Sequence, residues 1–219
     1  METSSNQLTT HKNLTPTVKK HINCAYKKPT ALHNEKEFKK ILSNIANSKF
    51  IIDTGCGTGL STEYLAELNP KYHILGLDKS TNRLSKASSS SKNLSFHRID
   101  LIDFFLLADK NNLKSEITYF LYPNPWPKSE HLKRRWHAHP IFPKILNCSK
   151  QIVLRTDWKI YLDEFKDALK IHEYELQKSE QLSLNQSDLN NGSLDQGISR
   201  FEQKFIKQKR NLYELIANE

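Results

Sequence analysis

Short apolar runs alternate with helical patterns along most of the chain. Five runs have the length and composition of buried strands, at residues 50–52, 72–77, 94–99, 117–121 and 151–154. Segments between them repeat apolar residues at helical spacing, as in residues 60–68 and 161–169. Because a parallel connection needs a crossover, this alternation predicts a doubly wound, mostly parallel α/β sheet with helices on both faces. The closing segment, residues 200–217, is expected to return as an antiparallel edge strand.

The pattern also divides the chain into two regions. Residues 1–33 are polar and basic without sustained periodicity, and they predict an irregular N-terminal arm. Asn34 is a candidate N-cap for a helix that places Phe38, Ile41 and Ile45 on one face. We expect one domain over residues 34–219, interrupted at residues 180–198 by a mobile loop rich in Ser, Asn, Gln and Gly.

Composition limits the classes of protein to consider. The 219 residues carry a formal net charge of +9, which favours a polyanionic partner such as nucleic acid, although a merely solvated basic surface is an equal alternative. No apolar run is long enough for a bilayer, and the three cysteines are too scattered for a disulfide framework or a zinc site. We therefore expect a cytoplasmic protein without membrane or metal. The sequence does not decide between a monomer and a homodimer.

Candidate cofactor residues follow three successive strands. Gly55, Gly57 and Gly59 form a loop after the first strand, where bare backbone can approach a ligand closely. Asp53, Asp78 and Asp100 stand at or just past the ends of the first three strands, hence along one edge of the sheet. Three carboxylates would repel a pyrophosphate but suit the cationic centre, ribose and adenine amine of S-adenosylmethionine. The alternative is that each aspartate caps the following helix.

A second candidate site lies in the stiff turn after the fourth strand. Pro123, Pro125 and Pro127 must end that strand, and they surround Asn124 and Trp126. A dense basic cluster follows, with Lys128, Lys133, Arg134 and Arg135 among aromatic residues. Such groups suit phosphate contacts and base stacking in RNA, although core packing is the alternative for the tryptophans.

Two motifs resemble known families. The run from Asp53 to Gly59 resembles the cofactor loop of class I methyltransferases, and residues 122–128 resemble the Pro-Asp-Pro-Trp-Pro-Lys signature of bacterial tRNA (guanine-N7)-methyltransferases, with Asn124 in place of the aspartate. The resemblance extends to Thr156-Asp157-Trp158 and to residues 199–202. It implies S-adenosylmethionine as cofactor and tRNA as partner, with Asn124 at the catalytic and cofactor position. It implies substrate contacts from Lys128, Asp157, Ser199, Arg200, Phe201 and Glu202.

The implied reaction is methyl transfer to N7 of a guanine in the variable region of tRNA. N7 has an in-plane lone pair and no proton to lose, so alignment matters more than a general base. An amide at position 124 can accept a hydrogen bond from the base but cannot offset its developing charge. Two alternatives stay open: methylation of an exocyclic amine, since Asn124-Pro125-Trp126 loosely resembles an amino-methyltransferase motif, and RNA binding by a catalytically impaired relative.

Overall fold

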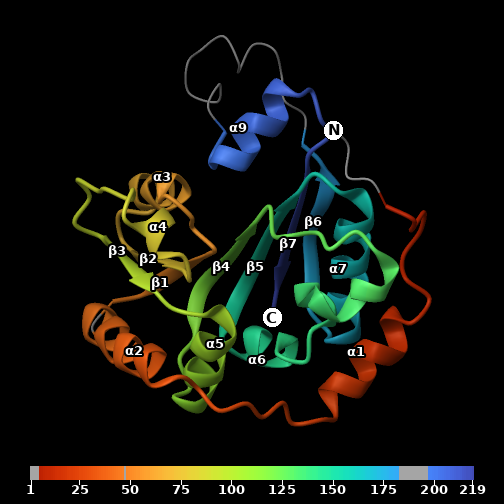
Figure 1. Ribbon diagram of the computed structural model, residues 1–219, viewed down its shortest axis with the longest axis horizontal. Helices are drawn as coiled ribbons and strands as arrows, with labels where there is room; N and C mark the ends of the chain where they lie inside the picture. Colours follow the sequence, from red (N-terminus) through yellow and green to blue (C-terminus); the bar gives the residue numbers. More distant parts are fainter. Residues whose placement is uncertain (1–4, 47, 183–196) are drawn as a thin grey trace.

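A mixed sheet forms the centre of the molecule (Figure 1). The computed structural model describes residues 5–46, 48–182 and 197–219, and within these it contains seven strands in the order β3-β2-β1-β4-β5-β7-β6. The strands are β1 (Phe50–Thr54), β2 (His73–Asp78), β3 (Leu94–Arg98), β4 (Ser115–Leu121), β5 (Ser149–Thr156), β6 (Glu175–Gln181) and β7 (Tyr213–Asn218). β1 to β5 pair in parallel, and β7 runs antiparallel to both of its neighbours. The predicted doubly wound, mostly parallel fold is confirmed.

Helices cover both faces of this sheet. They are α1 (Leu14–Ile22), α2 (Leu32–Ile45), α3 (Leu60–Leu68), α4 (Thr81–Leu84), α5 (Leu101–Lys110), α6 (Phe142–Asn147), α7 (Lys159–Ile171) and α9 (Arg200–Lys207), with short 3-10 helices η1 (Ser129–Arg134) and η2 (Trp136–Ala138). Ile51 packs with Leu65 of α3 on one face, whereas Ile52 belongs to the larger core that includes Phe104 of α5 and Phe165 of α7. The period-two alternation of a strand thus directs neighbouring residues into two separate cores.

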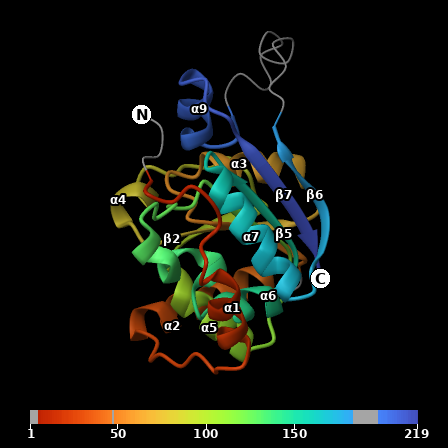
Figure 2. The same ribbon diagram turned by 90° about the vertical axis from the view of Figure 1, so that its right-hand side faces the viewer.

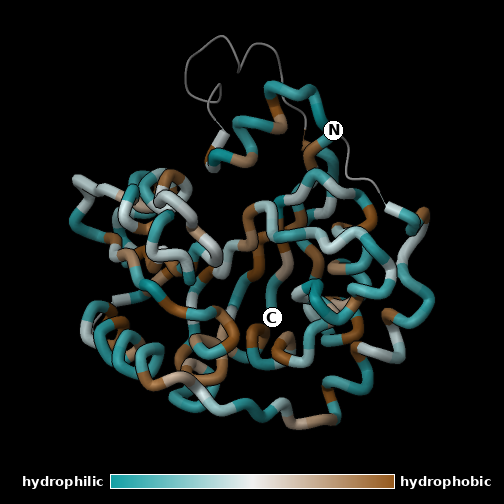
Figure 3. The backbone as a smooth tube through the Cα atoms, in the orientation of Figure 1, coloured by the Kyte–Doolittle hydropathy of each residue, from teal (hydrophilic) through white to brown (hydrophobic). Residues whose placement is uncertain are grey.

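Central strands are buried on both faces. All five residues of β1 are buried, as expected for a parallel strand between two helical layers. Figure 3 shows the same feature as hydrophobic colouring along the strands in the middle of the molecule and hydrophilic colouring over much of the outside. Among the described residues, no helix is both long and apolar enough to cross a bilayer.

The closing segment is more complex than a single edge strand. Its first part forms α9, and its second part forms β7, which lies between β5 and β6 (Figure 2). Leu215 and Ala217 are fully buried in β7, so this strand belongs inside the sheet, while the mostly exposed, polar β6 forms the edge. The predicted loop at 180–198 overlaps the end of β6, and its residues 183–196 lie outside the described part of the chain.

The N-terminal region is not irregular throughout. Residues 14–22 form α1, whose buried Leu14 and Val18 pack into the main core, and the helix lies against α7. Two apolar residues one turn apart were too short a pattern to stand out among basic neighbours. Asn34 is not an N-cap either, because α2 begins at Leu32 with Ala31 before it. The buried Asn34 amide instead donates a hydrogen bond to Asp103 at 2.7 Å.

Candidate active site

A cavity of about 330 Å³ opens where the chain changes direction across the sheet. β1 and β4 are neighbours there, and the strand order runs outward from them in both directions. Ligands of open α/β sheets bind at the carboxyl ends of strands beside such a switch point. α9 lies beyond the same ends of the strands (Figure 1). The cavity is lined by Asp53, Gly55, Cys56, Gly57, Thr58, Leu60, Ser61, Arg83, Leu121, Ser199, Arg200, Phe201 and Lys204.

The glycine loop between β1 and α3 presents bare backbone to this cavity. Gly55 and Gly57 both have positive φ, 70° and 62°, a region that other residues rarely adopt. A Cβ atom on Gly55 would meet nothing within 4 Å, so this backbone borders open space. Gly59 serves a different purpose, because a Cβ atom there would lie 2.6 Å from the Phe96 ring. Gly55 and Gly57 therefore wall the cavity, while Gly59 lets α3 pack closely.

Asp53 is the buried acid of the cavity. Its Oδ2 atom accepts hydrogen bonds from Ser61 at 2.6 Å and Thr62 at 2.7 Å. Its Oδ1 atom is buried and has no hydrogen-bond partner among the described residues. Burial raises the pKa of Asp53, and the two hydroxyl donors oppose that rise. A cationic or donor group in the cavity would satisfy the unpartnered oxygen.

The other two predicted cofactor acids do not line the cavity. Asp78 accepts hydrogen bonds from the backbone N–H groups of Gly57 and Ser80 and lies 3.4 Å from a guanidinium nitrogen of Arg83. Asp100 caps α5 through the N–H groups of Ile102 and Asp103, at 2.9 and 3.4 Å. The helix-cap alternative thus describes the contacts of Asp100. Ligand binding by Asp78 and Asp100 stays a prediction.

α9 contributes a third wall. Ser199 caps the helix by accepting from the N–H of Glu202, and both Ser199 and Arg200 line the cavity. Phe201 also lines it and is 53% exposed. Glu202 faces the opposite way, is buried, and receives an ion pair from Arg155 at 2.9 Å.

That ion pair fixes α9 to the sheet. Arg155 of β5 also contacts Glu214 of β7 at 2.7 Å, so one guanidinium joins α9 to two strands. Glu202 therefore has an anchoring contact in this structure, and its predicted substrate contact stays untested.

The proline turn begins at the rim of the cavity. Leu121, the last residue of β4, lines it, and the chain then turns through Tyr122 with a φ of 52°. Asn124 is exposed and outside the cavity lining, and its Oδ1 atom accepts from the N–H of Trp126 at 3.2 Å. Lys128 is also exposed. Asn124 and Lys128 thus follow a cavity-lining residue closely in the sequence, but neither lines the cavity itself.

The basic cluster after the turn is divided between surface and core. Lys133 and Arg134 are exposed, and the Arg134 guanidinium lies over the Trp126 ring at 4.7 Å. Arg135 is instead fully buried and forms an ion pair with Glu164 at 2.5 Å, so the predicted phosphate contact from Arg135 is wrong. Trp136 packs against Phe120, which agrees with the core alternative for this residue.

Asp157 forms an ion pair with Arg210 at 2.7 Å. The first turn of α7 is preceded by Trp158, so the alternative role of Asp157 as an N-cap is not observed. Among the described residues, no group of three or more His, Cys, Asp or Glu side chains is arranged to hold a metal ion.

Comparison with known proteins explains this combination of cavity, turn and strand order. Residues 47–215 match the family described as "Putative methyltransferase". A tRNA (guanine-N(7)-)-methyltransferase of Alkaliphilus oremlandii is 33% identical over 76% of this chain and 79% of its own length. The chain belongs to the tRNA (guanine-N7)-methyltransferase family.

More distant members and structures agree. A family member from Desulfitobacterium hafniense is 25% identical over 85% of this chain and 91% of its own. An antibiotic-related methyltransferase structure superposes with a TM-score of 0.58 at 14% identity, covering 88% of this chain and 97% of the other. The structure of the 16S rRNA methyltransferase KamB superposes with a TM-score of 0.54 at 12% identity, covering 87% of this chain and 94% of the other. At these identities the two structures support the fold alone.

Several residues of this family member's site were not predicted from the sequence. Ser61 and Thr62 hold Asp53 from the first turn of α3, and their spacing from Asp53 was an available signal. Arg83 and Lys204 bring positive charge to the cavity from α4 and α9. Lys204 follows the C-terminal element at residues 199–202, where it stands in place of a family arginine, but Arg83 belongs to no motif.

Proposed function

We propose that the protein transfers a methyl group from S-adenosylmethionine to N7 of a guanine in the variable region of tRNA. Family membership supports this assignment, together with one observation of the structure: the unpartnered, buried Oδ1 of Asp53 in a cavity walled by glycine backbone. A carboxylate in that environment suits a ligand with a cationic amino acid portion. We place the enzyme in the cytoplasm, as a monomer or a homodimer.

The residues of the cavity fit that cofactor. Asp53 would hold the positively charged end, and the backbone at Gly55 and Gly57 leaves room for close approach. Asp78 stands behind Gly57 and next to Arg83, where a shift of the exposed arginine would free an oxygen for ribose hydroxyls. Bound S-adenosylmethionine would supply an electrophilic methyl group. The protein's part is to hold the guanine in line with it.

Substrate residues would come from both sides of the cavity mouth. Lys128, Lys133 and Arg134 are exposed on the proline-turn side, and Arg200, Phe201 and Lys204 lie on α9. The cations would contact phosphates, and Trp126 or Phe201 would stack on a base. We assign Asn124 the role of orienting the guanine through its amide, because an amide accepts hydrogen bonds but carries no charge.

The same amide keeps an alternative activity open. A side-chain amide between two prolines is suited to orienting an exocyclic amine, which would make the protein an amino-methyltransferase acting on RNA. The exposure of Asn124 and the hydrogen bond from Trp126 fit either substrate group.

One experiment separates these activities. Purified protein is incubated with unmodified tRNA transcripts and labelled S-adenosylmethionine, and the digested nucleosides are identified by mass spectrometry. We expect 7-methylguanosine. An N2- or N6-methylated nucleoside would instead support the amino-methyltransferase, and cofactor binding without transfer would indicate a catalytically impaired RNA-binding protein.

A further inference from the structure

The carbonyl groups of the proline turn are held by a buried arginine. Arg135 directs Nε and Nη2 to the carbonyl oxygen of Trp126, at 3.2 and 3.1 Å, and Nη2 also reaches the carbonyl of Lys128 at 3.3 Å. The guanidinium is fully buried and lies 4.9 Å from the centre of the Trp158 ring. Its donors are therefore directed to the turn, to Glu164 and to Gln7, rather than to solvent or an external phosphate.

Glu164 of α7 balances the charge of this arginine. It accepts hydrogen bonds from Arg135 at 2.5 Å, His137 at 3.0 Å, the amide of Gln7 at 2.6 Å and the backbone N–H of His11 at 2.8 Å. Burial alone would raise the pKa of Glu164, but the hydrogen bonds and charges of His137 and Arg135 outweigh it and lower the pKa to about 2. The carboxylate is thus ionised and fully hydrogen-bonded inside the protein.

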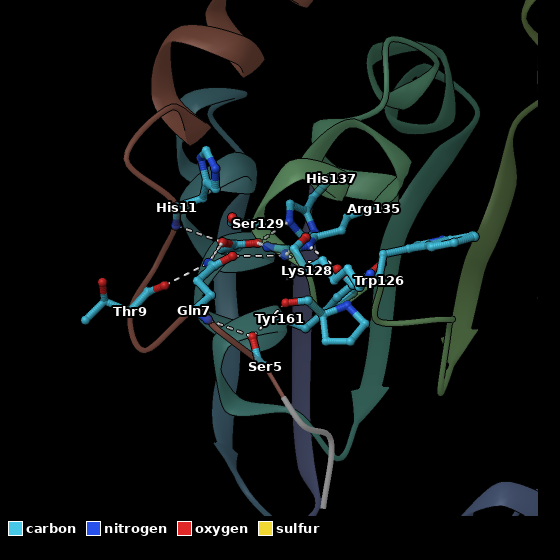
Figure 4. A network of polar contacts seen from close by, with 12 residues as sticks. Ser5, Gln7, Thr9, His11, Trp126, Lys128, Ser129, Arg135, His137 and Tyr161 are labelled. Carbon is cyan, nitrogen blue, oxygen red and sulfur yellow. Dashed lines mark hydrogen bonds and ion pairs between the residues drawn. The ribbon is translucent and has the colours of Figure 1, made fainter.

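The N-terminal segment also contacts the Arg135–Glu164 pair and the proline turn (Figure 4). We call residues 5–11 the strap. Gln7 connects both charged groups, because its Nε2 donates to Glu164 and its Oε1 accepts from Arg135 at 2.9 Å. Ser5 donates to the carbonyl of Pro127 at 2.6 Å, and Asn6 accepts from the N–H of Ser129 at 3.3 Å. The strap therefore contacts the turn at two points independent of Arg135.

The turn depends on these contacts because its own residues offer few backbone hydrogen-bond donors. Pro123, Pro125 and Pro127 lack N–H groups, so the segment cannot join the β4 ladder. Trp126 adopts a φ of 47°, an uncommon conformation for an aromatic residue, and such conformations persist where the surroundings determine them. Contacts from Arg135 and the strap meet the carbonyls of residues 126, 127 and 128 in succession.

We propose that Gln7, Arg135 and Glu164 are positioning residues that set the backbone of residues 124–128, and that the strap is part of the substrate site's framework rather than an RNA-binding arm. This inference rests on the proposed function, since it concerns how Asn124, Trp126 and Lys128 are presented to tRNA. None of the three positioning residues lines the cofactor cavity. Their effect should therefore appear in the use of tRNA and not in binding of S-adenosylmethionine.

The sharpest test is Gln7→Ala, which removes the three side-chain hydrogen bonds of Gln7, with Thr9, Glu164 and Arg135, while keeping the Arg135–Glu164 ion pair. Ser5→Ala removes the separate contact to Pro127. Thr9→Ala is the matched control, because Thr9 is exposed and the network uses only its backbone carbonyl. Each full-length variant is assayed for amide hydrogen exchange at residues 124, 126 and 128–135, for the Kd of S-adenosylmethionine, and for kcat and KM with tRNA.

For Gln7→Ala we expect faster exchange at residues 124, 126 and 128–135. We also expect a fall in kcat/KM for tRNA of about tenfold or more, because small misplacements of contact groups are costly. The Kd for S-adenosylmethionine should stay within about twofold of wild type, since the cavity is untouched. Ser5→Ala should show a smaller change in the same direction, and Thr9→Ala none.

Three results would overturn the proposal. Unchanged exchange in Gln7→Ala would show that the strap does not hold the turn, and faster exchange with unchanged kcat/KM would show that holding it does not matter. Weaker cofactor binding in parallel with lost activity would indicate general destabilisation. If wild-type protein makes no 7-methylguanosine, the proposed function fails, whereas the exchange rates still decide whether the strap fixes the turn.

Discussion

Asn124 stands where the proline signature that this chain resembles has an aspartate. Its amide oxygen already accepts the N–H of Trp126 at 3.2 Å, so the side chain stabilises the turn as well as being available to substrate. A carboxylate could accept the same hydrogen bond and would add a negative charge beside the base. The residue thus separates two contributions, orientation and charge, that an aspartate would combine.

Asn124→Asp measures the charge contribution directly. We expect kcat/KM for tRNA to change by less than about tenfold, because in-line alignment supplies most of the barrier reduction for a nucleophile without a proton to lose. The measurement is single-turnover methylation at saturating cofactor, with Asn124→Ala as the variant that removes orientation and charge together. A gain of several orders of magnitude in Asn124→Asp would show that charge stabilisation dominates.

At the scale of elements, the spacing of hydrophobic residues predicted the strands of the parallel part of the sheet. The runs that became β1 to β5 are continuous apolar segments bounded by turn residues, and a parallel sheet buries such segments on both faces. β6 was missed because its sequence, from Glu175 to Gln181, is polar and only alternate residues are partly covered at the edge of the sheet. Local pattern cannot reveal a strand whose stability comes from pairing with β7.

The site was predicted where it depended on short motifs and missed where it depended on distant contacts. Asp53 and the glycine loop are adjacent in sequence and in space. The link from Gln7 to Glu164 spans 157 positions, and no spacing rule connects them. Arg135 looked like its neighbours Lys133 and Arg134, yet it is buried because Glu164 and the strap surround it.

A substitution in α9 tests whether this helix forms part of the cofactor site. Phe201 is an apolar side chain that lines the cavity while remaining 53% exposed, so it can contact a ligand. Its one ring contact among the described residues is with Phe205, at 6.1 Å between centroids. Phe201→Ala should raise the Kd for S-adenosylmethionine about three- to tenfold, the loss expected from removing partly buried apolar contact, with little change in the free energy of unfolding. Titration calorimetry and denaturant unfolding measure the two quantities.

Leu68→Ala is the matched control for Phe201, since Leu68 is 60% exposed at the end of α3 and does not line the cavity. It should leave the Kd unchanged. Equal affinities in wild type and Phe201→Ala would remove α9 from the cofactor site and leave it a role on the substrate side alone.

At the scale of the whole molecule, the charge of +9 matters through its distribution. α1 carries Lys19, Lys20 and His21 in its last turn. Burial lowers the pKa of His21, and the nearby charges of Lys133 and Lys20 lower it further, so both of these exposed lysines lie near His21. The N-terminal region therefore has two parts: the strap contacts the proline turn, while the end of α1 brings Lys20 near Lys133 of η1.

This arrangement predicts a local salt effect on tRNA binding. Lys133→Gln should weaken binding and reduce the slope of log Kd against log salt by about one, the loss of one phosphate contact. Lys150→Gln makes the same change in net charge, but Lys150 pairs with Glu116 at the amino end of β5, opposite the cavity. Its slope should match that of wild type. If both variants lower the slope equally, net charge alone attracts tRNA. If only Lys133→Gln does, the surface around Lys133 of η1 contacts tRNA.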